Sequence, residues 1–158
     1  MGDFAVGKTS LIRRYIEGIF DEKYLTTVGV VVSRKSIVFA ETNIKLLVWD
    51  LAGGRDFTHT GYLTGAAGAF LVCDITRAST LAAYYAYAQQ IRQVNPQVEL
   101  ILLANKSDLL IQREITDEEL GTVSSDIGAP VIMTSAKSGE MVDDAFTQLA
   151  KKVLLVPN

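Results

Sequence analysis

The sequence has little of the chemistry that builds disulfide or metal frameworks: it contains one cysteine and one histidine among 158 residues. A single cysteine, Cys73, excludes an intrachain disulfide and a cysteine-based zinc site. A single histidine, His59, leaves little room for a histidine-rich metal centre. We therefore expect a protein of a reducing compartment.

Long apolar runs and an excess of positive charge are also missing. No uninterrupted apolar run comes near the ~18 residues of a membrane span, and no signal peptide or carboxyl-terminal lipidation cysteine is visible. Fifteen Lys and Arg stand against eighteen Asp and Glu, and the net charge of −3 argues against a general nucleic-acid binder. We expect a cytoplasmic protein without a membrane anchor of its own.

The sequence does contain apolar runs that alternate with helical patterns, over one domain of residues 1–158. Apolar residues make up 49% and charged residues 21%, so the chain is expected to fold. Strands are predicted at Val30–Phe39, Ile44–Trp49, Gly68–Cys73, Val98–Ala104 and Val131–Met133. Helices are predicted at Lys8–Glu17, at Leu81–Val94 with Ser79 as N-cap, after a capping box at Thr116–Glu119, and at Glu140–Val153. This order predicts an α/β fold, a doubly wound and mainly parallel sheet with helices on both faces, whose ligands bind beyond the carboxyl ends of the strands.

Residues 2–9 fit the phosphate-binding pattern G-x-x-x-x-G-K-[ST], as Gly2-Asp3-Phe4-Ala5-Val6-Gly7-Lys8-Thr9. The glycines let the backbone curl, so that several N–H groups point at phosphate oxygens. Lys8 places a cation on the β- and γ-phosphates, and the Thr9 hydroxyl can coordinate Mg²⁺. The alternative, an ordinary glycine turn before a helix, is disfavoured because further nucleotide motifs follow in order.

A phosphate loop normally follows a strand, but only Met1 precedes Gly2. In a doubly wound fold that strand would lie in the middle of the sheet. Its absence would leave the neighbouring strand edges and their backbone groups without partners. We therefore expect residues 1–158 to be a domain truncated at its amino end, before the phosphate loop.

Two motifs that follow later strands predict recognition of a guanine base. Asn105-Lys106-Ser107-Asp108 fits the pattern N-K-x-D, in which the Asp108 carboxylate can accept from both N1–H and the exocyclic amine of guanine. Adenine lacks that donor pair and would leave the carboxylate unpaired. The Lys106 stem can pack along the base and ribose. Ser135-Ala136-Lys137 is a weaker signal for a backbone N–H facing the guanine oxygen, and a plain helix-capping turn explains it equally well.

The segment Trp49-Asp50-Leu51-Ala52-Gly53 closes another predicted strand. Asp50 is placed to reach Mg²⁺ through water, and the Gly53 N–H is placed to sense the γ-phosphate. The alternative is a turn with a capping aspartate.

The ordered set GDFAVGKTS, TTVGV, WDLAGG, NKSD and TSAKSGE resembles a small GTPase of the Ras superfamily, most of all its Rab-like branch, which includes bacterial Rab-like proteins. The resemblance covers essentially the whole chain. It implies a six-stranded sheet with five helices, one GTP or GDP, one Mg²⁺, and protein effectors and regulators that bind through two switch regions.

The resemblance also implies roles for individual residues. Ser10 completes the phosphate loop, Phe20 covers the guanine edge-on, and Tyr24 lies near the phosphates. The metal set is Thr9, Thr27 and Asp50. The catalytic set is Lys8, Thr27 and Gly53. Residues Gly53–Leu63 match the second switch, while Trp49 and Tyr62 match two of three effector-surface aromatics and Val32 replaces the third.

Two departures from the family pattern bear on catalysis. The residue after Gly53 is normally a glutamine that orients the attacking water, but here it is Gly54, so we expect slow GTP hydrolysis and a faster rate in Gly54→Gln. Phe4 stands where a small residue is usual. Its ring either crowds the space through which an arginine finger enters, or turns outward and packs on the second switch. Three side chains lie near enough in sequence to replace the glutamine, namely Arg55, Asp56 and His59. The alternative, which the sequence favours, is that each is a solvated residue of the second switch.

Three functional classes remain distinguishable by experiment. A regulatory GTPase hydrolyses bound GTP in a single-turnover assay, whereas a GTP-binding interaction module does so negligibly. An ATPase or nucleotide kinase uses the same phosphate loop, but Asn105–Asp108 argues against it. Asp108→Asn should move base preference from guanine toward xanthine.

Overall fold

The computed structural model describes residues 1–22, 27–39, 41–54 and 60–155. Its helices are α1 (Lys8–Glu17), α2 (Ser79–Val94), α3 (Asp117–Ile127) and α4 (Val142–Leu155). Its strands are β1 (Val30–Phe39), β2 (Thr42–Leu51), β3 (Gly68–Asp74), β4 (Glu99–Asn105) and β5 (Val131–Thr134). Short 3₁₀ helices lie at Thr60–Tyr62 and Ser107–Gln112. The predicted elements are thus confirmed, with ends shifted by one or two residues.

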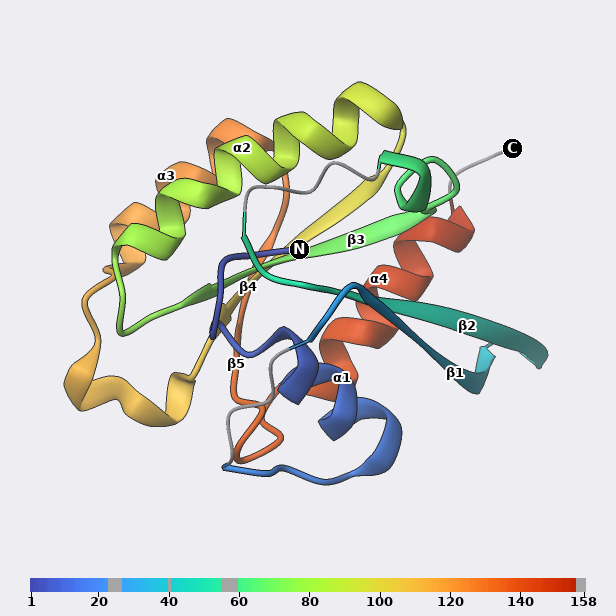
Figure 1. The fold of residues 1–158 in the computed structure, drawn as a ribbon, viewed down its shortest axis with the longest axis horizontal. Coiled ribbons are helices and arrows are strands. Elements are labelled where there is room, and N and C mark those ends of the chain that lie inside the picture. Colours follow the sequence, from blue (N-terminus) through green and yellow to red (C-terminus); the bar gives the residue numbers. More distant parts are fainter. Residues whose placement is uncertain (23–26, 40, 55–59, 156–158) are drawn as a thin grey trace.

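The strands form a parallel sheet in the order β3-β4-β5 and an antiparallel pair of β1 with β2. In the parallel sheet Leu71 lies opposite Leu102, and Leu102 opposite Val131. Helices α2 and α3 cover one face of this sheet and α1 and α4 the other, as Figure 1 shows. This arrangement confirms the predicted α/β class with helices on both faces.

The core is divided between the two faces because side chains alternate along each strand. Leu71 and Cys73 of β3 face the α2–α3 side and pack with Tyr84. Val72 faces the α1–α4 side and packs with Phe146. Since both faces of β3 and β4 are buried, their sequences are continuous apolar runs.

One predicted helix start is confirmed and another is wrong. The capping box at α3 is present: the Thr116 side chain accepts from the Glu119 N–H, and the Glu119 carboxylate accepts from the Thr116 N–H at 2.7 Å. Ser79, predicted as the N-cap of α2, is the first residue of the helix. The cap is Ala78, whose N–H donates to the Glu114 carboxylate at 2.8 Å, so an acidic side chain distant in sequence replaces the local cap.

The sheet departs from the six strands with five helices that the resemblance implies. Within the described ranges no strand lies between β2 and β3, and a groove of about 620 Å³ separates them. Met1 makes a single strand-like bridge at its edge: its amine donates to Phe70 O at 2.6 Å, and the Val72 N–H donates to Met1 O at 2.8 Å. This pattern of neighbours, one residue before and one after Leu71, is that of a parallel ladder.

Candidate functional site

The phosphate loop folds back over its own lysine. The Lys8 Nζ atom donates to the carbonyl oxygens of Gly2 and Asp3, both at 2.8 Å. Gly7 has a φ of 98°, in the left-handed region, and a Cβ there would collide with the side-chain amide of Asn105. Only glycine therefore fits where the loop turns into α1.

The electrostatics at the base of this loop favour an anion. Burial lowers the pKa of the Lys8 ammonium to about 8, while the charges of Asp50 and Asp3 oppose that shift and Arg77 adds to it. A phosphate placed against Lys8 would restore the stability of the charged form. The first N–H groups of α1 lack partners within the helix, and the first residues of α1 line the same cavity.

Thr9, Thr27 and Asp50 come together from α1, the segment before β1, and β2. Thr9 Oγ1 donates to Asp50 Oδ2 at 2.6 Å and lies 2.7 Å from Thr27 Oγ1, which is 3.2 Å from the same carboxylate oxygen. Asp50 is 4% exposed, and among the described residues its Oδ1 has no hydrogen-bond partner. A buried carboxylate oxygen without a partner is costly. Hydroxyl and carboxylate oxygens are ligands that Mg²⁺ prefers, so this donor set fits that ion.

Asn105, at the end of β4, connects three loops. Its side-chain amide donates to Val6 O at 2.9 Å, in the phosphate loop. Its Oδ1 accepts from the Ala136 N–H at 3.2 Å and from the Thr134 hydroxyl at 3.3 Å. Because Asn105 is 1% exposed, these bonds are shielded from water and fix the loops relative to one another.

The wall opposite the phosphate loop is held by side chains from two further elements. Ser135 donates its hydroxyl to Asp108 Oδ1 at 2.6 Å, which orients that carboxylate. Arg14 of α1 donates to the carbonyls of Ala136 at 2.8 Å and Lys137 at 2.5 Å. Arg14 was missed by sequence reasoning because no local motif marks it; only the packing of α1 beside this loop brings it there.

These loops surround a cavity of about 340 Å³. Of the residues predicted from the sequence, it is lined by Phe4, Ala5, Gly7, Lys8, Thr9, Ser10, Phe20, Thr27, Gly53, Asn105, Lys106, Asp108, Ala136 and Lys137. Others do not line the cavity itself, namely Gly2, Asp3, Val6, Asp50 and Ser135. Tyr24, with Arg55, Asp56 and His59, lies outside the described residues.

The Phe4 ring lies on Gly54. Phe4 is 57% exposed, and a Cβ added to Gly54 would sit 2.7 Å from Phe4 Cε2 and 2.8 Å from Cζ. Gly54 also has a φ of 107°, a conformation that residues with a side chain rarely adopt. The ring therefore packs on the second switch, as in one of the two orientations considered, and Phe4 also lines the cavity.

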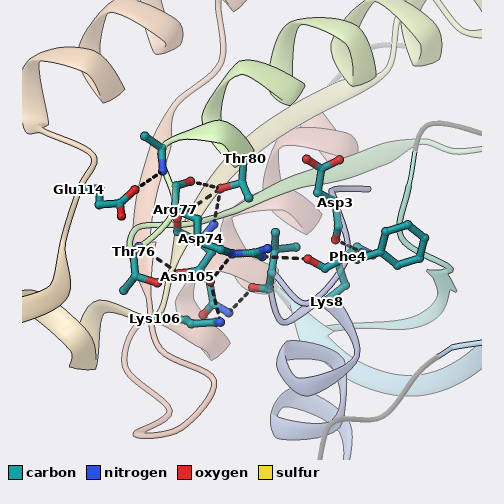
Figure 2. Close-up of polar contacts among 12 residues, drawn as sticks. Asp3, Phe4, Lys8, Asp74, Thr76, Arg77, Thr80, Asn105, Lys106 and Glu114 are labelled. Carbon is teal, nitrogen blue, oxygen red and sulfur yellow. Dashed lines mark hydrogen bonds and ion pairs between the residues drawn. The ribbon is translucent and has the colours of Figure 1, made fainter.

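Sequence reasoning missed Asp74, a charged residue at the carboxyl end of β3. It is 1% exposed and accepts from Lys106 Nζ at 2.6 Å and from Arg77 Nε at 3.0 Å (Figure 2). Burial raises the pKa of the Asp74 carboxyl, but hydrogen bonds from Lys106 and Thr76 outweigh burial and hold the pKa below its ordinary value. Its position directly after a buried parallel strand was the available signal, since ligand-site residues gather at such ends.

Two aromatic side chains stand side by side away from the cavity. The rings of Trp49 and Tyr62 are 5.6 Å apart and inclined at 43°, and both side chains are about two-fifths exposed. Val32, the residue at the third predicted position, is also exposed.

Among the helices that the structure describes, none has the length and apolar character of a membrane-spanning segment.

A parallel α/β sheet with a glycine-lysine phosphate loop at its carboxyl edge defines a P-loop nucleotide-binding protein. A sequence model of the Ras family matches residues 1–155. The Ras-related protein Rab-13 of Mesocricetus auratus is 36% identical over 98% of this chain and 78% of its own length. RabJ of Dictyostelium discoideum is 33% identical, over 98% of this chain and 62% of its own length, and Rab5A of Oryza sativa subsp. japonica is 32% identical, over 98% and 77%.

The chain belongs to the Ras family, and its relatives make it Rab-like. Membership supports guanine-nucleotide binding, GTPase activity and a switching function with protein effectors and regulators.

Proposed function

We propose that this chain is a guanine-nucleotide switch whose GTP hydrolysis is slow. The contact between Phe4 and Gly54 carries the proposal. Gly54 has no side chain to orient an attacking water, and the Phe4 ring fills the space into which a side chain at residue 54 would grow. The two departures from the family pattern therefore fit each other: the large side chain at residue 4 requires the absence of a side chain at residue 54.

The nucleotide site that we propose follows the 340 Å³ cavity. Lys8 binds the β- and γ-phosphates, Asp108 and Lys106 bind the guanine, and Phe20 covers it. The bonds from Asn105 to Val6 and Ala136 support this assignment, because they hold the base loop against the phosphate loop. The complete set that we propose is residues 2–10, Phe20, Tyr24, Thr27, Asp50, Gly53, Asn105, Lys106, Asp108 and Ser135–Lys137.

Mg²⁺ is proposed to be held by Thr9, Thr27 and Asp50. The Asp50 Oδ1 atom supports this site, because a cation would satisfy a buried carboxylate oxygen that has no hydrogen-bond partner among the described protein atoms. When bound, the ion neutralises charge on the phosphates.

Switching would depend on contacts that differ between GTP and GDP. Thr27 and the Gly53 N–H are the groups proposed to sense the γ-phosphate, one in each switch segment. Loss of that phosphate would release both contacts, which supplies the differential free energy that a switch needs. The exposed Trp49–Tyr62 pair supports a partner surface beside the second switch.

The test is single-turnover GTP hydrolysis in Mg²⁺ by the wild type, Gly54→Gln, and Phe4→Gly with Gly54→Gln. We expect the double variant to hydrolyse GTP faster than the wild type by roughly tenfold or more. Gly54→Gln alone should gain less, because the Phe4 ring and the φ of 107° oppose the new side chain. The matched control is Phe4→Leu with Gly54→Gln, which keeps a bulky side chain at residue 4 and should stay slow.

The possible results of this assay lead to different conclusions about the function. A double variant no faster than the wild type would show that Gly54 is not the cause of a low rate. A wild type that holds GTP firmly but never cleaves it would favour a GTP-binding interaction module.

A further inference from the structure

Asp74 is shared by two cations from different loops. Its Oδ2 atom accepts from Lys106 Nζ at 2.6 Å and from Arg77 Nε at 3.0 Å. Its Oδ1 atom accepts from the Thr76 N–H at 3.0 Å and the Thr76 hydroxyl at 2.7 Å. With 1% of its surface exposed, the carboxylate is satisfied by protein groups alone, and charge-assisted bonds of this kind are the strong ones.

Arg77 extends this arrangement to the phosphate loop. While its Nε bonds Asp74, its Nη2 atom donates to the Phe4 carbonyl at 2.8 Å. Figure 2 shows the resulting chain of contacts, from Lys106 through Asp74 and Arg77 to Phe4. Two side chains, those of Asp74 and Arg77, therefore link three segments distant in sequence, namely the base loop, the turn after β3 and the phosphate loop.

The charge balance explains why the carboxylate matters. Removing it would leave Lys106 and Arg77 side by side without a counter-ion, and Arg77 already adds to the repulsion felt by Lys8. Two unpaired cations would separate, and each would displace the loop that it contacts. Disturbance at either end would therefore reach the other end through Asp74.

We propose that Asp74 and Arg77 are positioning residues that couple the guanine loop to the phosphate loop, so that correct binding at one end of the nucleotide strengthens binding at the other. The inference rests on the proposed guanine-nucleotide site. Coupling of this kind is reciprocal, and is commonly worth fivefold or more in affinity.

A purely structural role is the competing explanation, because Asp74 also belongs to the turn that starts α2. The Thr80 hydroxyl contacts the Asp74 N–H at 3.0 Å and the Arg77 carbonyl at 2.7 Å, which shapes that turn without touching either nucleotide loop. The two roles differ in one observable. A structural defect lowers stability. Lost coupling instead changes discrimination between bases when Arg77 is substituted, although Arg77 contacts the phosphate loop and not the base loop.

The experiment measures affinities for GDP and for inosine diphosphate, which lacks the exocyclic amine that Asp108 is proposed to bind. The variants are Arg77→Met and Asp74→Asn, with Arg92→Met as the control, since Arg92 lies in the last turn of α2 at its far end. We expect Arg77→Met to weaken GDP binding and to reduce the preference for GDP over inosine diphosphate by about fivefold. Asp74→Asn should do the same and more, and Arg92→Met should match the wild type.

Asp74→Asn can fail to fold, because its side chain is buried. Arg77 is 41% exposed at its side chain, so Arg77→Met carries the test by itself. An unchanged preference for GDP over inosine diphosphate in a folded Arg77→Met would overturn the coupling. A wild type that binds neither nucleotide, or prefers ADP to GDP, would instead overturn the proposed function.

Discussion

At the scale of single residues, burial decides which side chains are reactive. Cys73 lies in β3 and is fully buried. Its side chain belongs to the core between the sheet and helices α2 and α3. Burial raises the pKa of its thiol to about 11, and the Tyr84 hydroxyl bonds the Cys73 backbone N–H at 3.0 Å. The thiolate is the reactive form, so a buried thiol with a raised pKa is inert.

We expect the native protein to react with a disulfide reagent at pH 8 at least a hundredfold more slowly than the same protein in urea. The thiolate fraction at that pH falls about tenfold for each unit by which the pKa rises, and burial adds a barrier to access. Reaction followed by absorbance measures both rates, and Cys73→Ala supplies the blank. Native protein that reacts as quickly as unfolded protein would show that β3 is open to solvent.

At the scale of elements, helix ends are stabilised by side chains in two ways. Helix α3 has a local capping box, whereas α2 receives its carboxylate from Glu114, after β4. The capping box of α3 can be identified from four consecutive residues. The bond from Glu114 to the start of α2 exists only because the turn after β4 lies against that helix end. This explains the wrong prediction at Ser79.

We expect Thr116→Ala to lower the free energy of unfolding by about 1 kcal/mol at pH 7. Hydrogen bonds from the Thr116 N–H and hydroxyl lower the pKa of Glu119 below its ordinary value of 4.5. A carboxyl group whose pKa is lowered by folding stabilises the protein at pH values above its ordinary pKa. This contribution is lost as the pH falls from the ordinary pKa through the lowered one. The difference between the two proteins in urea unfolding should therefore shrink below about pH 4.5.

The matched control for the cap is Thr122→Ala in the same helix, where the hydroxyl bonds only the Glu118 carbonyl one turn earlier. It should change stability by less than half as much, because such a bond adds little to a helix. Equal losses in the two variants would remove the cap as the explanation.

At the scale of the whole molecule, the main irregularity is the groove between β2 and β3. Asp50 and Asp74 lie at the carboxyl ends of these two strands, where they bond Thr9 and Lys106, two residues that line the 340 Å³ cavity. The single bridge from Met1 to β3 has parallel geometry. The groove is also lined by apolar side chains from both covering layers, including Ile91 and Phe146. Its edges and walls therefore suit one additional parallel strand.

A variant extended before Met1 by seven apolar residues, the length of β3, is expected to melt several degrees higher than residues 1–158. The added strand would pair with both edges and bury apolar surface on both faces. An extension of seven Gly and Ser residues is the control and should leave the melting temperature unchanged. Coincident melts of the apolar and polar extensions would show that the groove does not take a strand.

Local patterns predicted most of the fold. Helix α1 and strand β1 have the predicted ends, because apolar spacing and flanking glycines mark them. The phosphate loop and the N-K-x-D motif were equally visible, since each needs fixed residue types at fixed spacing. Asp74, Arg77 and Arg14 were not predicted, because the partners that connect them to other loops (Lys106, Phe4 and Lys137) lie 32 to 123 positions away along the chain.

The sequence by itself determined the alternation of strands and helices, the family, and the residue types of the proposed nucleotide site, because these follow from periodicity and short motifs. Tertiary structure alone decided which side chains form contacts between the loops. It placed a buried carboxylate between Lys106 and Arg77 and set the Phe4 ring on Gly54. It also left one oxygen of Asp50 without a hydrogen-bond partner among the residues that the structure describes. The physical reason is that a short motif encodes local geometry, whereas pairing of buried charges and exclusion of side chains depend on which segments the packed sheet brings within a few ångströms.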